Sequence, residues 1–348
     1  MDGGRLSLGS DARKQGGVPC PASGRRILSL SLAGRRRAKR DGADCIQASH
    51  DVLASPKGNP NMVELCQGPD PHPRQPRLPA PKLATDTHFH ILGPAARYPY
   101  IPDREYTPPE ALPAACRHLL RTLGIGRAVI VQPSVYGADN RCAMDAAAEL
   151  GVPARVVVVV PYATPDKELD RLHAGGARAI RFIVAHAGGL PLDDLERFSA
   201  RAKDRGWHIQ LLLRASDLAA LEPRLAKLPS DFVIDHMGFI KPAEGGIEQP
   251  AFQVLLRLLR GGRCWIKFSG AYRQTDEAPP YPSLLPFACT LVEARPDRLL
   301  WGSDWPHAVF KGKMPNTTDL FDLLGNWVPD EKTRTRILVD NPATLFNF

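Results

Sequence analysis

The stretch LATDTHFHILGP, residues 83–94, places His88 and His90 two positions apart behind a short run of small and apolar residues. Residues two apart in a β-strand point to the same face, so we expect the two imidazoles to lie together on one side of a strand. A single buried histidine is usually a hydrogen-bonded core residue. A pair on one face, at the carboxyl end of a strand, favours a functional site.

Seven further stretches repeat this pattern of a short apolar run followed by a polar loop. Near-continuous Val, Ile and Leu is typical of strands buried on both faces, as parallel strands are. Candidate helices lie between the runs, and several begin at Pro or Asp and end at Gly. The predicted strands are residues 83–90, 127–134, 154–162, 177–182, 207–213, 231–238, 264–270 and 298–304. The predicted helices include residues 110–123, 139–150, 191–205, 216–227, 250–260 and 282–294.

This alternation of strand and helix predicts a single α/β domain, a (β/α)8 or TIM barrel. A doubly wound sheet has the same alternation, but no G-x-G-x-x-G sequence follows the first predicted strand. We expect the barrel to occupy residues 76–348. Residues 1–75 are expected to form a low-complexity basic extension that is disordered or lies upstream of the true start.

Polar residues gather where the predicted strands end. Active sites of such barrels lie at the carboxyl ends of the strands, so this distribution predicts a site at that mouth of the barrel. The polar residues at or just after the strand ends are His88, His90, Gln132, Ser134, Arg181, Arg214, Asp235, His236, Ser269, Arg273, Asp304 and His307.

The net charge of +8 lies mostly in the N-terminal part of the chain. Residues 1–61 hold 11 Lys and Arg against five Asp, and the densest part, GRRRAKR at 34–40, lies among Gly and Ser. That composition predicts disorder. The tail is open to three interpretations: a nucleic-acid arm, an organelle transit peptide, or sequence upstream of a start at Met62, which we favour. The remainder is nearly neutral, which argues against nucleic acid as the main partner.

The composition of the 348 residues, 43% hydrophobic and 24% charged, is typical of a globular protein with a large core. No apolar run is long enough to span a bilayer, so no membrane association is expected. The seven cysteines are scattered and never spaced as CxxC, which predicts neither a disulfide framework nor a thiolate zinc site. A reducing compartment, the cytoplasm, is the expected location.

Several motifs together resemble the amidohydrolase superfamily: HxH at the end of the first predicted strand and the Asp of WGSDWPH at the end of the last. Within it, TDTHFHILGP, YTPPEAL, VQPSVYGADN, DHMG, KFSGAYR and DNPATLF look most like the 2-pyrone-4,6-dicarboxylate lactonase branch. The resemblance extends over about residues 83–348. It implies a hydrolase that opens a carboxylated lactone, or a related cyclic ester, during breakdown of aromatic compounds.

The resemblance also implies roles for eight side chains. A carboxylate would activate water, and three histidines, at least one of which must carry a proton, would donate hydrogen bonds to the developing oxyanion. Arginine would pair with a substrate carboxylate through its planar guanidinium. A structural aspartate and a salt bridge across the barrel mouth are the alternatives. The predicted catalytic residues are Asp304, His88, His90 and His236, and the predicted substrate-binding residues are Arg181, Arg273, Tyr106 and Ser134.

Metal-dependent members of the superfamily use a histidine on strand five and a lysine on strand four. Here the strand-five histidine, His208, lies near the amino end, and strand four has no lysine. A nearby Arg181 would also disfavour a dication. We therefore expect no cofactor, with zinc as the alternative. The zinc ligands would then be His88, His90, His236 and Asp304.

Two departures from the lactonase pattern affect the expected substrate. Phe239 follows DHMG where the branch tends to have a basic residue, and no second arginine follows Arg181. A dicarboxylate needs two anchoring cations, and His186 would replace one only if it were protonated. The alternatives are isomerisation of a sugar-acid lactone, a metal-dependent amidohydrolase or decarboxylase, and nucleic-acid binding through residues 25–40.

Overall fold

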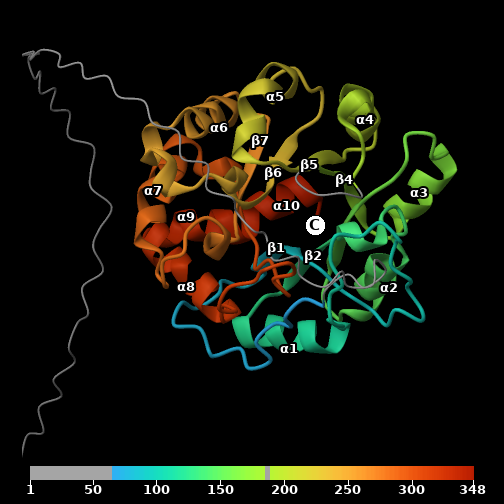
Figure 1. Cartoon of the computed structure of the whole chain (residues 1–348), viewed down its shortest axis with the longest axis horizontal. Coiled ribbons are helices and arrows are strands. Elements are labelled where there is room, and N and C mark those ends of the chain that lie inside the picture. The colour runs from blue at the N-terminus through green and yellow to red at the C-terminus, as the bar shows by residue number, and fades with distance from the viewer. Residues whose placement is uncertain (1–64, 185–188) are drawn as a thin grey trace, which may run out of the picture.

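The computed structural model describes residues 65–184 and 189–348. Eight strands form one sheet in the order β1 to β8, and each neighbouring pair is parallel. Figure 1 shows the strands at the centre, with helices arranged around them. This arrangement confirms the predicted (β/α)8 barrel.

Each predicted strand overlaps an observed one, and each of the six predicted helices contains an observed helix. The strands are β1 (Thr85–Phe89), β2 (Arg127–Val131), β3 (Ala154–Val158), β4 (Ala177–Ile183), β5 (His208–Leu212), β6 (Phe232–Ile234), β7 (Cys264–Phe268) and β8 (Leu299–Trp301). The helices are α1 (Pro113–Leu123), α2 (Arg141–Glu149), α3 (Asp166–Ala174), α4 (Leu195–Asp204), α5 (Leu218–Leu225), α6 (Pro250–Arg260), α7 (Leu285–Ala294), α8 (Thr317–Trp327), α9 (Glu331–Thr335) and α10 (Asn341–Phe346).

Helix α1 illustrates how the local sequence determines an element. Pro113 begins it, where the missing N–H would have no intrahelical partner anyway. Gly124 ends it at a φ of 73°, a left-handed conformation that glycine adopts without a steric penalty. One face of the helix packs against the barrel. The buried side chains on that face are Cys116, Leu119, Leu120 and Leu123.

The strands bury both faces, as their apolar composition predicted. Outward side chains pack under the helices in the main core, and inward side chains form a separate cluster inside the barrel. Helix α10 lies across the centre of the ring in Figure 1 and contributes to this inner cluster, so it closes the amino end of the barrel. The inner cluster consists of Val129, Val131, Val157, Ala179, Val233, Trp265, Leu300, Leu345 and Phe346.

The barrel closes between β1 and the segment that follows β8. The backbone N–H of Asp304 donates to the carbonyl of His88 at 2.7 Å, and the N–H of His90 donates to the carbonyl of Trp305 at 2.8 Å. These two hydrogen bonds hold the end of the first strand beside the end of the last. The same bonds therefore bring two predicted catalytic residues, 216 positions apart, into contact.

A buried carboxylate and a glycine complete this seam. Oδ1 of Asp86 accepts hydrogen bonds from the backbone N–H groups of His88 at 3.1 Å and Ser303 at 2.9 Å, bridging the two strands. A Cβ atom at Gly302 would lie only 2.5 Å from Cβ of His88. The close approach of the two backbones therefore requires glycine at position 302.

The described chain begins before the predicted domain boundary. The backbone N–H groups of Arg77 and Leu78 donate to the Asp322 carboxylate on α8, at 2.9 and 3.0 Å. The segment around Arg77 therefore runs along the outside of the barrel, beside α8.

Residues 1–64 of the expected extension, with the basic tail and the start at Met62, lie outside the described residues, whereas residues 65–75 are described. There the Asn316 amide, at the start of α8, donates to Oδ2 of Asp70 at 2.8 Å and to the carbonyl of His72 at 3.0 Å, so this part of the extension packs on the barrel. In the part of the chain that is described, no helix is both long and apolar enough to cross a bilayer. Four of the described cysteines are free thiols: Cys66, Cys116, Cys142 and Cys264.

Gly302→Ala is expected to lower the free energy of unfolding by about 2 kcal/mol, because an added methyl group overpacks the seam against His88. Urea unfolding measures the change. Gly325→Ala in α8 is the matched control, since its Cβ would lie at an ordinary 3.8 Å from Leu78. The control should leave stability unchanged or raise it by about 0.5–1 kcal/mol. Equal losses in both variants would contradict the requirement for glycine at the seam.

Candidate active site

A pocket with about 440 Å³ of empty space, counting the part open to solvent, lies at the carboxyl end of the strands. Seven of the eight predicted site residues line this pocket. The remaining one, His88, is fully buried below the pocket, in contact with two of the histidines that line it. The seven predicted residues that line the pocket are His90, Tyr106, Ser134, Arg181, His236, Arg273 and Asp304.

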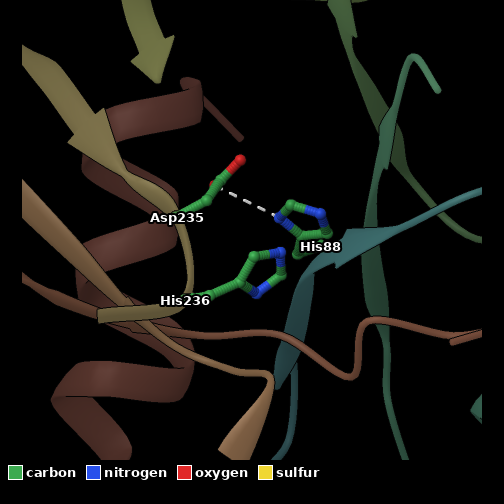
Figure 2. A group of neighbouring side chains, drawn as sticks. All are labelled: His88, Asp235 and His236. Carbon is green, nitrogen blue, oxygen red and sulfur yellow. Dashed lines mark ion pairs between the residues drawn. The ribbon is translucent and has the colours of Figure 1, made fainter. Parts of the chain in front are cut away.

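Three imidazoles converge at the bottom of the pocket. The ring centroid of His88 lies 5.2 Å from that of His90 and 4.6 Å from that of His236. Figure 2 shows His88 on β1 and both Asp235 and His236 on the segment after β6, with their side chains directed toward one another. His236 and Met237 adopt left-handed φ values of 51° and 49°, a strained conformation of the kind that clusters at functional sites.

Asp304 presents one carboxylate oxygen to these imidazoles. Its Oδ2 accepts hydrogen bonds from the Tyr272 hydroxyl at 2.6 Å and from Nε of Arg273 at 2.7 Å. Its Oδ1 lies 3.9 Å from Nε2 of His88 and 3.8 Å from Nε2 of His236. Burial alone would raise the pKa of Asp304, but the Arg273 guanidinium and the imidazoles outweigh it and hold the pKa well below its usual range.

A hydrogen-bonded chain behind Asp304 fixes its orientation. The single proton of the Tyr272 hydroxyl goes to Asp304, so the hydroxyl oxygen accepts from Nδ1 of His307 at 3.0 Å. Nε2 of His307 then accepts from the Thr317 hydroxyl at 2.9 Å. His307, which follows β8, therefore supports the site from behind and does not line the pocket.

The site histidines are neutral. Nδ1 of His90 donates to the carbonyl of Val131 at 2.7 Å, which leaves Nε2 with a lone pair and no proton. Burial lowers the pKa of His90 to about 3 and that of His236 to about 4. Burial also lowers the pKa of His88 well below its usual value. A histidine that donates to an oxyanion here would therefore use the single N–H of a neutral ring.

Lys267 on β7 lies below His88 and was missed from the sequence. Its Nζ donates to the carbonyl of Thr87 at 2.8 Å and to Oε1 of Gln210 at 2.9 Å. It also lies 3.3 Å from Nδ1 of His88 and 3.5 Å from Oδ1 of Asp235. Burial lowers the pKa of Lys267 to about 8, so the ammonium form prevails at neutral pH.

The sequence does carry a signal for this lysine. The strand CWIKF is otherwise apolar and aromatic, and Lys267 shares the inward face with Trp265. A fully buried lysine is rare unless it is paired, so one in a strand buried on both faces indicates an internal polar cluster.

Arg181 on β4 is buried but retains unused hydrogen-bonding capacity. Its Nη1 donates to the carbonyl of Gln132 at 2.5 Å, and its Nη2 lies 3.6 Å from Oδ2 of Asp235. Its Nε has no hydrogen-bond partner within the described chain. Arg273 is more committed, because Nε is bound to Asp304 and Nη2 donates to the carbonyl of Ala308 at 2.9 Å.

Other polar residues singled out from the sequence do not reach the pocket. Arg214 is exposed, and the Gln132 amide donates to loop carbonyls at 2.9 and 3.1 Å. His208 lies at the amino end of the barrel with its ring 4.9 Å from that of Phe346, as its position in the strand predicted. His186 falls on residues 185–188, which lie outside the described residues.

Two groups of described residues have ligand atoms close enough to hold a metal ion, and both include His88. They are His88, Asp235 and His236, and His88, His90 and Asp304. A metal-binding histidine normally donates its other ring N–H to a carboxylate or carbonyl. Nδ1 of His88 lies near Asp235 at 3.2 Å, but it also faces the Lys267 ammonium, which can only donate. This donor set suits a divalent cation poorly.

The buried charges around the pocket also balance without a metal ion. Three carboxylates face three cations, and the histidines are neutral, so a dication would add two uncompensated charges in a region shielded from water. The carboxylates are Asp86, Asp235 and Asp304, and the cations are Lys267, Arg181 and Arg273.

Comparison with known proteins gives a consistent result. A family model described as amidohydrolase matches residues 85–348. The 4-sulfomuconolactone hydrolase of Hydrogenophaga intermedia is 37% identical over 287 residues, which cover 81% of this chain and 94% of the relative. The 2-pyrone-4,6-dicarboxylate hydrolase of Comamonas testosteroni is 35% identical over 287 residues, which cover 79% and 93%. A crystal structure from Agrobacterium tumefaciens is 32% identical with a TM-score of 0.72, covering 78% of this chain and 98% of that one.

His208→Leu is expected to reduce the loss of stability in acid. Burial lowers the pKa of His208 to about 3, so below pH 6.5 the unfolded chain binds a proton that the folded chain does not, and stability falls. Removing this histidine should reduce the slope of unfolding free energy between pH 5 and 6 by about 1.2 kcal/mol per pH unit.

Urea unfolding at several pH values measures this slope for the wild type and the variant. Between pH 7 and 8 the histidine is neutral in both states, so there the two slopes should agree. An unchanged slope between pH 5 and 6 would show that His208 is protonated in the folded barrel.

Proposed function

The chain belongs to the amidohydrolase family, and from this premise we propose that it opens a carboxylated lactone, or a related cyclic ester, by attack of water. The free Oδ1 of Asp304, directed at three imidazoles at the bottom of a pocket, is the observation that carries the proposal. A carboxylate in that position can orient a water molecule and take its proton. The hydrolase activities of the two relatives, as their names state them, support the same reaction class.

In the first step, Oδ1 of Asp304 accepts a proton from water as the water oxygen bonds to the ester carbon. The low pKa keeps Asp304 ionised but makes it a weak base. Stabilisation of the oxyanion must therefore contribute much of the rate acceleration. In the second step, the bond from the ester carbon to the ring oxygen breaks, and Asp304 returns its proton to that oxygen. One water is consumed, and the ring becomes a hydroxy acid.

His88 is fully buried below the pocket, so we assign it to orienting Asp304, and we assign the donor to the oxyanion to His236, which lines the pocket. Nδ1 of His88 faces the Lys267 ammonium in hydrogen-bond geometry, whereas Oδ1 of Asp235, at 3.2 Å, has no hydrogen-bond partner among the described residues. Because Nδ1 accepts a hydrogen bond from the Lys267 ammonium, the single proton of the neutral ring lies on Nε2, which is directed toward Asp304. His90 has the opposite tautomer and accepts at Nε2, so we assign it to orienting water.

The substrate carboxylate is assigned to Arg181, with Ser134 and Tyr106 beside it in the pocket lining. Arg181 lines the pocket, where its charge is only partly compensated by Asp235, whose Oδ2 lies 3.6 Å from Nη2. Arg273 is assigned to holding Asp304 ionised and in position.

Asp304→Asn is expected to reduce kcat for lactone opening by at least about a thousandfold, because the amide cannot take the proton from water. The loss of ultraviolet absorbance of a panel of carboxylated lactones measures turnover, and a thermal melt checks the fold. Retained turnover in a folded variant would remove Asp304 as the base. A product with the mass of the substrate, instead of substrate plus water, would indicate a lactone isomerase.

We expect turnover without a bound metal ion, since the charges around the pocket balance and Lys267 faces His88. Activity should survive prolonged dialysis against a chelator, with metal content measured on the same sample. Activity that disappears with the metal and returns only when zinc is added would support the metal-dependent alternative.

A further inference from the structure

The pocket has an apolar side formed by three consecutive strands. Ile183 and Leu212 are paired residues at the ends of β4 and β5, and Phe239 follows β6. These three residues form a hydrophobic cluster separate from both larger cores, and all three line the pocket. We call Ile183, Leu212 and Phe239 the apolar wall.

The polar contacts to a ligand lie on the opposite side. Tyr106 follows β1 and Ser134 follows β2, and in a closed eight-stranded barrel these strands lie across from β5 and β6. Arg181 starts on β4, below Ile183, but its guanidinium reaches the carbonyl of Gln132 at the end of β2. The Arg181 guanidinium therefore lies on the side of the pocket that faces the apolar wall.

The other cations near the pocket lie away from the apolar wall. Arg273 bonds Asp304 and the carbonyl of Ala308, and Lys267 is fully buried below His88. These bonds use two of the five N–H groups of Arg273, so it can still donate, but it lies beside Asp304 and not on the apolar wall, whose three side chains carry no hydrogen-bond donor. A second carboxylate placed against the apolar wall would lose its hydration without gaining a partner.

We propose that the substrate is a lactone with a single carboxylate, held at Arg181, Ser134 and Tyr106, and with an apolar substituent packed against the apolar wall. This inference rests on the proposed function. It differs from the dicarboxylate in the name of one relative, and it assigns Phe239 as the residue that selects against a second negative charge.

Three pyrones with one ring and different substituents test the proposal: 4-methyl-2-pyrone-6-carboxylate, 2-pyrone-4,6-dicarboxylate and the neutral 4,6-dimethyl-2-pyrone. The wild type should open the methyl carboxylate with a kcat/KM at least about tenfold above those of the other two. That ratio corresponds to about 1.4 kcal/mol of transition-state discrimination. A higher kcat/KM for the dicarboxylate would overturn the proposal.

Phe239→Arg should reverse the preference, because it places a cation on the apolar wall. The ratio of kcat/KM for the dicarboxylate to that for the methyl carboxylate should rise at least about a hundredfold. Phe239→Leu is the matched control, and it should keep the wild-type order of substrates. Circular dichroism and a thermal melt establish that both variants fold. An unchanged ratio in folded Phe239→Arg would reject the assignment of Phe239.

Binding without turnover separates this inference from the proposed function. Calorimetry with 3-methylbenzoate and isophthalate, which carry one and two carboxylates at the matching positions and cannot be hydrolysed, reports the preference of the pocket alone. Tighter binding of 3-methylbenzoate in the absence of any pyrone opening would support the selection for one carboxylate by the pocket and reject the proposed pyrone hydrolysis. Tighter binding of isophthalate would reject the inference whether or not pyrones are opened.

Discussion

The contact between the first and last strands is the constraint on which this molecule depends. A barrel must close, and here closure uses two backbone hydrogen bonds, the buried carboxylate of Asp86 and the missing side chain of Gly302. The same backbone bonds hold His88 and Asp304 next to each other. Closing the fold and assembling the site are therefore one event, and damage to the seam should affect stability and chemistry together.

The inner cluster fills the amino end of the barrel with apolar side chains, and the interior above it holds polar and charged side chains. Lys267, Gln210 and Asp235 form a hydrogen-bonded and ion-paired layer below the imidazoles. Buried charges of this kind are costly unless they are paired, and here each has an opposite charge within reach. This layer therefore supports the proposed water-activating groups from below with fixed polar contacts, which the residues that line the pocket do not provide.

Much of this could be predicted from the sequence. Eight apolar runs set the strand order, and the alternation of side chains placed His88 and His90 on one face. Their position at strand ends indicated which mouth carries the site. What alternation cannot predict is which partner a side chain finds. Arg273 lines the pocket, but its position after a strand did not predict that Asp304 would hold its Nε, nor did strand position predict the burial that lowers the pKa of His90 to about 3. Lys267 was missed, because a single lysine in an apolar strand does not show by itself which buried groups it contacts.

The apolar wall has a consequence for what happens after the ring opens. Hydrolysis turns an uncharged ester into an acid that ionises, so the bound molecule gains a negative charge where it had none. That charge appears beside Asp304, whose own counter-ion is already engaged, and opposite a hydrocarbon surface that offers no cation. In the proposed reaction, electrostatic repulsion would therefore weaken binding as the chemistry ends and favour release of the hydroxy acid.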